Sequence, residues 1–235
     1  MPDQSLPKCS RQWPRLSVRG LIVLVLVIGA GLGWVVRSAR IQREAVTAIE
    51  KVGGGVIYDW EWKNGDYIWG GKPWPPKWLI ERMGVDYFGQ VVVVYSRKNN
   101  RMSDAEMVYV GHLAGLVSLS LSGCSTTDFG LANLRGLTDL QELELDDTQV
   151  TEVGLAHLKG LTKLSRLELD NTQVTDVGLA HLKALTSLSE LDLSGTQVTD
   201  DGLNELRRAL SRLTTYHRID AIPTGLEAPR SVRIH

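Results

Sequence analysis

A 24-residue unit, repeated three times without an insertion, constrains the fold of this chain more than any other feature. The copies are Thr127–Val150, Thr151–Val174 and Thr175–Val198, with a degenerate copy at Ser103–Thr126 and a partial copy at Thr199–Leu213. Each unit joins the alternating pattern of a short strand to leucines at helical spacing. A unit of this size cannot bury its own apolar side, so neighbouring units must stack. The period therefore predicts a solenoid rather than a closed globule.

Stacking in register places identical residues of successive units against one another. The leucines would then form three continuous columns, which are Leu119, Leu143, Leu167 and Leu191; Leu121, Leu145, Leu169 and Leu193; and Leu116, Leu140, Leu164 and Leu188. Each buried leucine contributes roughly 1.5–3 kcal/mol, so we expect these columns to be the main source of stability. A glycine also recurs, at Gly130, Gly154, Gly178 and Gly202, and predicts close approach of neighbouring units there. Thr175 and Asp176 are placed to cap the free N–H groups of the helix that follows.

The units resemble leucine-rich repeats, because LxxLxL is followed by a small polar residue and then a helix. The ending LxLxxTxVTDxGLxxL is most similar to the ribonuclease-inhibitor-like or cysteine-containing subclass. In that family an Asn or Cys after the strand hydrogen-bonds the backbone of adjacent repeats. Here Cys124, Thr148, Thr172 and Thr196 take that place, and a Thr hydroxyl can do the same work. The resemblance covers Ser103–Leu213 and implies a short right-handed α/β solenoid, with a concave parallel sheet, convex helices and a protein-binding role.

An uncharged segment of 17 residues, Gly20–Val36, lies near the N-terminus between basic flanks. At about 1.5 Å per residue it is close to the shortest helix that crosses a bilayer core of about 30 Å. A cleaved signal peptide is the alternative, because small residues occur at Gly29, Ala30, Gly31 and Gly33. The run is long for such a peptide, however, and it continues through Trp34. We therefore expect an uncleaved transmembrane signal-anchor at 20–36, with a basic cytoplasmic tail at 1–19 and the repeats on the non-cytoplasmic side of the cell membrane.

Residues 37–101 are predicted to form a linker helix and an α+β cap that covers the first repeat. Within them, Arg40–Val52 has a helical pattern, Gly55–Trp62 a strand pattern, and Val91–Tyr95 is expected to be the first strand of the sheet. Five tryptophans crowd this region, namely Trp60, Trp62, Trp69, Trp74 and Trp78. They are either an aromatic platform for glycans or a Pro-rich ligand, or simply the core of the cap. An open solenoid end needs such a cover.

After the cap, residues 102–213 are assigned to the repeats, ending in an amphipathic capping helix at Thr199–Leu213. Residues 214–235 show no period, and we expect a poorly ordered tail. The order of anchor, cap and repeats from Ser17 to about Leu213 is similar to a group of membrane-anchored leucine-rich repeat proteins from planctomycete bacteria. That resemblance implies membrane attachment and carries over no catalytic residue.

Polar side chains that alternate with the core leucines should line the concave face of the sheet. Seven are acidic and one is basic; they are Glu142, Glu144, Asp146, Arg166, Glu168, Asp170, Glu190 and Asp192. We name these eight residues the acidic strip. It would attract a basic protein partner and speed its arrival at low salt. The alternative is an ordinary solvated face.

No catalytic or cofactor signature accompanies these features. The GxSxG, HExxH, phosphate-loop and dinucleotide patterns do not occur, so we expect no enzyme activity, no cofactor and no metal. The net charge of −1 gives no reason to expect nucleic acid, and Cys9 and Cys124 alone imply no disulfide framework. The sequence therefore favours a non-enzymatic, membrane-anchored leucine-rich repeat protein that binds a protein partner. The alternative is a secreted or periplasmic ligand-binding protein that uses the Trp-rich cap after signal cleavage.

Overall fold

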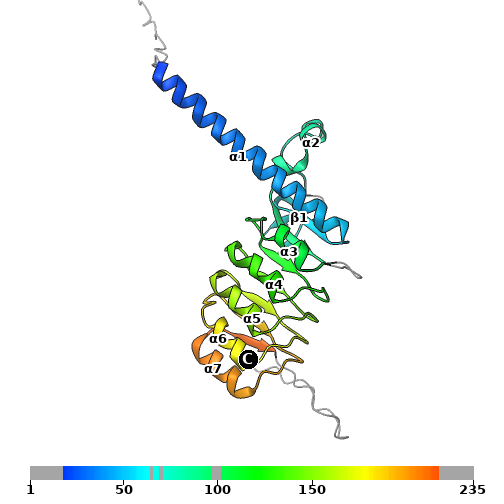
Figure 1. Ribbon diagram of the computed structural model, residues 1–235, viewed down its shortest axis with the longest axis vertical. Helices are drawn as coiled ribbons and strands as arrows, with labels where there is room; N and C mark the ends of the chain where they lie inside the picture. The colour runs from blue at the N-terminus through cyan, green and yellow to red at the C-terminus, as the bar shows by residue number, and fades with distance from the viewer. Residues whose placement is uncertain (1–17, 64–65, 69–70, 97–101, 217–235) are drawn as a thin grey trace, which may run out of the picture.

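The computed structural model describes residues 18–63, 66–68, 71–96 and 102–216. Figure 1 shows a long helix that leads into a cap and then into a row of stacked strand–helix units. One seven-stranded sheet, in the order β1-β4-β5-β6-β7-β8-β9, runs through cap and units, and β2 and β3 form a separate pair. The architecture is α/β, as expected from the repeats.

The repeated strands are parallel and pair in a register of one repeat period. They are β5 (Ser118–Ser120), β6 (Glu142–Glu144), β7 (Arg166–Glu168) and β8 (Glu190–Asp192). Leu143 lies opposite Leu119 on one side and Leu167 on the other. The side chains of all three leucines have no exposed surface. The predicted leucine columns are therefore confirmed, and they form one continuous core.

Helical segments follow each strand and cover the other side of the core. They are α3 (Asp104–Val110), α4 (Asp128–Leu131) with η3 (Ala132–Gly136), α5 (Glu152–Leu155) with η4 (Ala156–Gly160), α6 (Asp176–Leu182) and α7 (Asp200–Ala209). Figure 1 shows them side by side along the stack. Sheet on one face and helices on the other leave the polar side chains of the strands facing solvent.

At the start of α3, α4 and α6 an aspartate binds the next unit. The Asp128 carboxylate accepts hydrogen bonds from the Thr151 backbone N–H at 2.8 Å and from its hydroxyl at 2.7 Å. Equivalent bonds join Asp104 to Thr127 and Asp176 to Thr199. Sequence analysis expected Asp176 to cap its own helix, and instead its carboxylate links two units.

These aspartates explain the recurring glycine. A Cβ added at Gly154 would lie 2.4 Å from Oδ1 of Asp128, which is closer than any side chain tolerates. Gly178 differs, because Glu152 replaces aspartate in the preceding unit and the nearest atom to an added Cβ is 3.1 Å away. Thr175 correspondingly makes no side-chain cap hydrogen bond. At Gly130, Gly154 and Gly202 a neighbouring carboxylate therefore excludes a side chain, which refines the expected close approach.

The small polar residue after each strand acts within its own unit. The Thr172 hydroxyl donates to the carbonyl oxygen of Leu169 at 2.7 Å, and Thr148 and Thr196 repeat this bond to Leu145 and Leu193. The expectation that these hydroxyls bridge adjacent repeats was wrong, because a short Thr side chain reaches the carbonyl three residues earlier first. Cys124 is buried at the same position, and burial raises the pKa of its thiol.

The N-terminal helix α1 is continuous over Val18–Lys51, so the expected linker helix is the second half of one long helix. Among the described residues it is the one helix that is long and apolar enough to cross a membrane, and 6 % of its most apolar window is buried. A signal sequence near the N-terminus would meet the same criterion of length and composition. Further along, Ala45 and Ile49 of α1 are fully buried against the cap and the first repeat.

The cap is built from β1 (Gly55–Tyr58), η1 (Asp59–Glu61), β2 (Trp62–Lys63), β3 (Asp66–Tyr67), α2 (Lys77–Met83), η2 (Val85–Tyr87) and β4 (Val91–Tyr95). Strand β1 pairs antiparallel with β4, and β4 pairs parallel with β5. The sheet therefore begins at β1 and not at Val91–Tyr95 as expected. The predicted strand Gly55–Trp62 ends at Tyr58, where the chain turns into η1.

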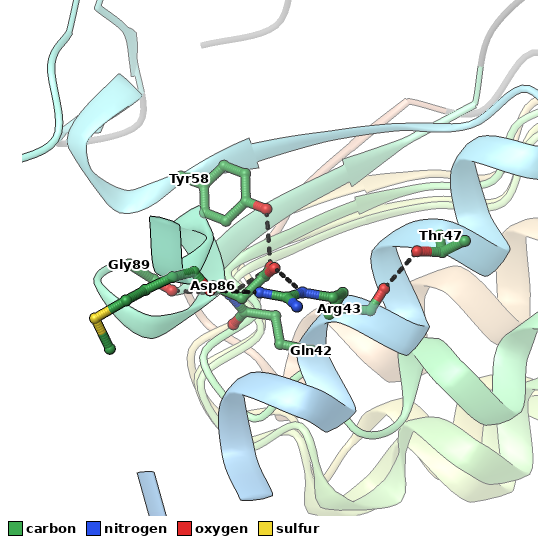
Figure 2. A network of polar contacts seen from close by, with 7 residues as sticks. Gln42, Arg43, Thr47, Tyr58, Asp86 and Gly89 are labelled. Atoms are coloured by element: carbon green, nitrogen blue, oxygen red, sulfur yellow. Dashed lines mark hydrogen bonds and ion pairs between the residues drawn. The ribbon is translucent and has the colours of Figure 1, made fainter. Parts of the chain in front are cut away.

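Polar contacts hold α1 on the cap, as Figure 2 shows. The Asp86 carboxylate accepts hydrogen bonds from the Tyr58 hydroxyl at 3.1 Å and from Nε of Arg43 at 3.2 Å. Its side chain is only 7 % exposed. Burial and the neighbouring Asp86 charge raise the pKa of Tyr58, so the phenol stays protonated as a donor. Gln42 adds a hydrogen bond from Nε2 to the Gly89 carbonyl oxygen at 2.8 Å.

The stack continues past the expected end of the repeats. Strand β9 (Thr214–Tyr216) pairs in parallel with β8, with Thr214 opposite Glu190 and Tyr216 opposite Asp192. The tail was expected to begin at residue 214, but these three residues complete another unit, of which α7 is the helix. Their spacing of one period from β8 and their β-favouring side chains account for this. Residues 217–235 of the expected tail lie outside the described residues.

Candidate functional site

The acidic strip lies on the solvent-facing side of the sheet, where the sequence placed it. Six members occupy strands β6, β7 and β8 in two rows, and Asp146 and Asp170 follow β6 and β7. The first row is Glu142, Arg166 and Glu190, and the second is Glu144, Glu168 and Asp192. Because the strands pair in register, residues one period apart become direct neighbours. The structure therefore brings the predicted residues together as one surface.

Arg166 is held by two carboxylates of the strip. Its Nη2 lies 2.6 Å from Oε1 of Glu168, and its Nη1 lies 3.2 Å from Oε2 of Glu190. These partners raise the pKa of Arg166, with the Glu168 hydrogen bond as the largest cause. The single cation of the strip thus fixes the orientation of two acids. Five further carboxylates leave the surface strongly negative.

The carboxyl group of Asp146 in the strip has a raised pKa. Burial is the main cause that raises its pKa to about 6, and the Glu168 charge contributes. The Asp170 backbone N–H donates to Oδ1 at 3.0 Å and the Ser122 hydroxyl donates to Oδ2 at 3.2 Å, and both bonds favour the charged form. Asp146 is therefore a structural member of the strip whose charge changes near neutral pH.

Tyr216 completes the second row of the strip, next to Asp192, and was not among the predicted site residues. With Arg166, Glu168, Glu190 and Asp192 it lines a shallow hollow of about 290 Å³ over β7 and β8. That volume is at the lower end of the range for small-molecule sites. The sequence contains the signal that places Tyr216 in this row, because Tyr216 follows Asp192 by one repeat period.

An exposed apolar column on the opposite side was also missed. Phe129, Val153 and Val177 each occupy the second position of a helix, and they are 83 %, 57 % and 66 % exposed. The repeat spacing identified these positions, but it did not show which side of the helix faces solvent.

The tryptophans of the cap do not act as one group. Trp60 stacks on Tyr58 with ring centroids 4.8 Å apart and is half-buried. Trp74 and Trp78 are instead 77 % and 65 % exposed. Trp69 lies outside the described residues. The tryptophans in the described part of the cap therefore do not form a single platform.

The chemistry of the strip is that of recognition. Within the described ranges, no cluster of three or more His, Cys, Asp or Glu side chains is arranged to hold a metal ion. The carboxylates lie in rows across the sheet, and these negatively charged rows face solvent. The electrostatic potential of such a surface favours positively charged groups over negatively charged ones.

Residues 138–198 match the family model described as leucine rich repeat. The chain therefore contains leucine-rich repeats over these residues. Its repeat domain belongs to a class that generally lacks catalytic activity and typically mediates protein binding. The model covers the three strands that carry the acidic strip.

Solved structures provide three further likenesses. A leucine-rich repeat protein of Leptospira interrogans is 24 % identical, with a TM-score of 0.38, over 46 % of this chain and 27 % of that one. An internalin of Listeria monocytogenes is 22 % identical, with a TM-score of 0.38, over 55 % of this chain and 41 % of that one. The leucine-rich repeat ectodomain of a receptor kinase from Arabidopsis thaliana is 15 % identical, with a TM-score of 0.46, over 76 % of this chain and 91 % of that one. This chain thus spans less than half of the two bacterial proteins. No curated protein matches it.

Proposed function

We propose that this protein is a non-enzymatic, membrane-anchored leucine-rich repeat protein that captures a basic protein partner on the acidic strip. The observation that carries the proposal is the alignment of seven carboxylates and one guanidinium on one face of the sheet. A leucine-rich repeat domain suggests a protein partner. Attraction between the acidic strip and a basic partner would then make their association fast and dependent on salt.

The exposed apolar half of α1 supports the proposed attachment to the membrane. Residues such as Leu26, Leu32 and Trp34 are 61–70 % exposed, although they belong to the apolar half of the helix. Apolar side chains exposed in such numbers need another environment than water. The same helix runs without a break into the part that packs on the cap, which supports an anchor rather than a removable signal peptide. We further propose that the repeats face the non-cytoplasmic side of the cell membrane, because the N-terminal flank of the uncharged segment is basic and carries no acid other than Asp3.

Charge reversal on the strip tests partner capture. We would change Glu144, Glu168 and Asp192 together to Lys and measure association with synthetic Lys/Arg-rich peptides at low and high salt. The association rate should fall by at least about tenfold at 20 mM salt and become insensitive to salt.

The matched control reverses three exposed acids elsewhere, Glu44, Glu50 and Asp201, with the same change in net charge. Equal loss in both triple variants would mean that overall charge acts rather than the strip. Unchanged binding in the strip variant would reject the strip as the binding surface. Flotation with lipid vesicles after an alkaline wash tests the anchor separately, since a protein that had lost its signal peptide would be released.

A further inference from the structure

Two exposed tryptophans of the cap are held in fixed positions without a role in its core. Trp74 lies between Pro73 and Pro75, and its ring packs edge-on against Phe88 with centroids 5.8 Å apart. Trp78 follows at the start of α2. Because proline restricts the backbone on both sides of Trp74, the loop has little freedom to turn the Trp74 ring away from solvent. Large aromatic side chains displayed in this way mark an interaction surface.

This surface is continuous with the end of the apolar half of α1. Trp34 of α1 and Phe88 of the cap line the same hollow, and Phe88 is the residue that Trp74 packs on. The last residue of α2 is tied to α1, because Nη2 of Arg43 donates to the Met83 carbonyl oxygen at 2.8 Å. Figure 1 shows α2 at the end of the stack from which the apolar half of α1 projects.

Several basic side chains belong to the same segments of α1 and the cap as these aromatic residues. Exposed cations are Arg37, Arg40, Lys72, Lys77 and Arg82. Glu81 is the nearby exposed acid on α2, and its Oε1 lies 3.8 Å from Nζ of Lys77. Tryptophan and Lys or Arg together are the residues that concentrate where a membrane protein crosses the headgroup layer. An anionic lipid surface attracts each such cation, and the rings rest between the headgroups and the acyl chains.

We propose that the cap docks on the bilayer surface beside the anchor, with Trp74 and Trp78 in the headgroup layer and the neighbouring cations against lipid phosphates. The inference rests on the proposed anchoring by α1 and adds a second membrane contact to it. A lipid surface fits better than a soluble glycan or a Pro-rich peptide, because the aromatic patch joins the apolar helix and the five exposed cations of these segments outnumber the acids Asp59, Glu81 and Asp86. Docking would fix the angle at which the repeats leave the membrane.

A fluorescent probe near α2 tests the contact in the full chain. Cys9 and Cys124 are replaced by Ser, and a single cysteine carrying an environment-sensitive dye is introduced by Met83→Cys. The matched control places the same dye on the repeats by Val153→Cys; the two native residues are 41 % and 57 % exposed. Both chains are inserted into phosphatidylcholine–phosphatidylserine vesicles whose acyl chains carry bromine, which quenches the dye at short range.

We expect quenching at position 83 and none at position 153. In the Trp74→Ser/Trp78→Ser variant the quenching at position 83 should disappear while flotation with the vesicles persists. Lys72→Gln with Arg82→Gln should weaken docking roughly fivefold for each charge removed. Vesicles that float with the protein but leave both dyes equally bright would overturn docking and keep the anchor. A chain that an alkaline wash releases overturns the anchor and the docking that rests on it. A dye at position 83 that responds to a soluble oligosaccharide or a Pro-rich peptide, and not to lipid, overturns the lipid contact alone.

Discussion

The repeats and the cap bury apolar surface in two different ways. In the repeats, each contact is made to the next unit and recurs at one period, as with the pairing of Leu143 and Leu167. In the cap, a few contacts join residues far apart in the chain, as with Arg43 and Asp86. The repeats therefore distribute their stability, whereas the cap concentrates part of it in one buried carboxylate. A destabilising substitution should therefore unfold neighbouring units in the repeats, whereas in the cap its effect should stay local.

The largest effect is expected from a charge placed in a leucine column. Leu167→Asp should destabilise the repeats by more than about 4 kcal/mol, because it removes a buried side chain and places a carboxylate in the core. Circular dichroism during urea unfolding measures the loss. The control is Val177→Asp, at a residue that is 66 % exposed, and it should change stability by less than about 0.5 kcal/mol. A folded Leu167→Asp protein with normal stability would contradict the shared core.

The second effect tests whether the cap fails locally. Asp86→Ala removes the shared acceptor of Tyr58 and Arg43, and we expect a loss of about 2–3 kcal/mol confined to the contact between α1 and the cap. Hydrogen exchange should accelerate in the second half of α1 and in β1 while the amides of β6 to β8 keep their protection. Glu81→Ala, at an exposed carboxylate, serves as the control. Faster exchange throughout the repeats would show that the cap and the repeats unfold as one unit.

The third effect is a pH dependence on the strip. The pKa of Asp146 is raised to about 6 in the folded protein, so the folded state binds the proton more tightly than the unfolded chain does. Its contribution to stability is therefore present below pH 4 and is lost as pH rises through about 6. Since the group is partly exposed and screened by solvent, we expect a loss of about 1 kcal/mol.

Comparison with Asp146→Asn isolates this contribution from other carboxylates. The Asn side chain keeps an oxygen that accepts from the Asp170 N–H and does not titrate. The free energy of unfolding of both proteins is measured by urea unfolding between pH 4 and pH 7. Over this range the parent should lose stability relative to the variant as pH rises. A constant difference would mean that the pKa of Asp146 is ordinary.

The smallest effect concerns the one helix start that departs from the repeat. Glu152→Asp should supply the carboxylate that the Thr175 N–H and hydroxyl lack, and it should stabilise the protein by about 0.5–1.5 kcal/mol. The reciprocal change, Asp128→Glu, should remove the same pair of bonds to Thr151 and cost a similar amount. Shifts in the urea midpoint measure both. Equal midpoints for all three proteins would mean that these links contribute nothing.

Much of the strip could be predicted from sequence because a strict period fixes the register. Once β6, β7 and β8 are known to pair at one repeat, Glu144, Glu168 and Asp192 have to be neighbours. Tyr216 was missed because its unit keeps the spacing and loses the leucine pattern. The Thr hydroxyls were assigned the wrong acceptor, since periodicity says which residues align and not which carbonyl lies nearer.

The amino-acid sequence alone determined the period, the leucine columns, the face that carries the acids and the uncharged N-terminal segment. Each follows from local patterning, in which side-chain spacing sets the strand or helix face. Only the tertiary structure decided that α1 is one helix docked through Gln42 and Arg43, that Asp86 is buried beneath them, and that Trp74 stays exposed. These features depend on contacts between segments about 40 residues apart that share no repeat, and local pattern does not encode which distant partners meet.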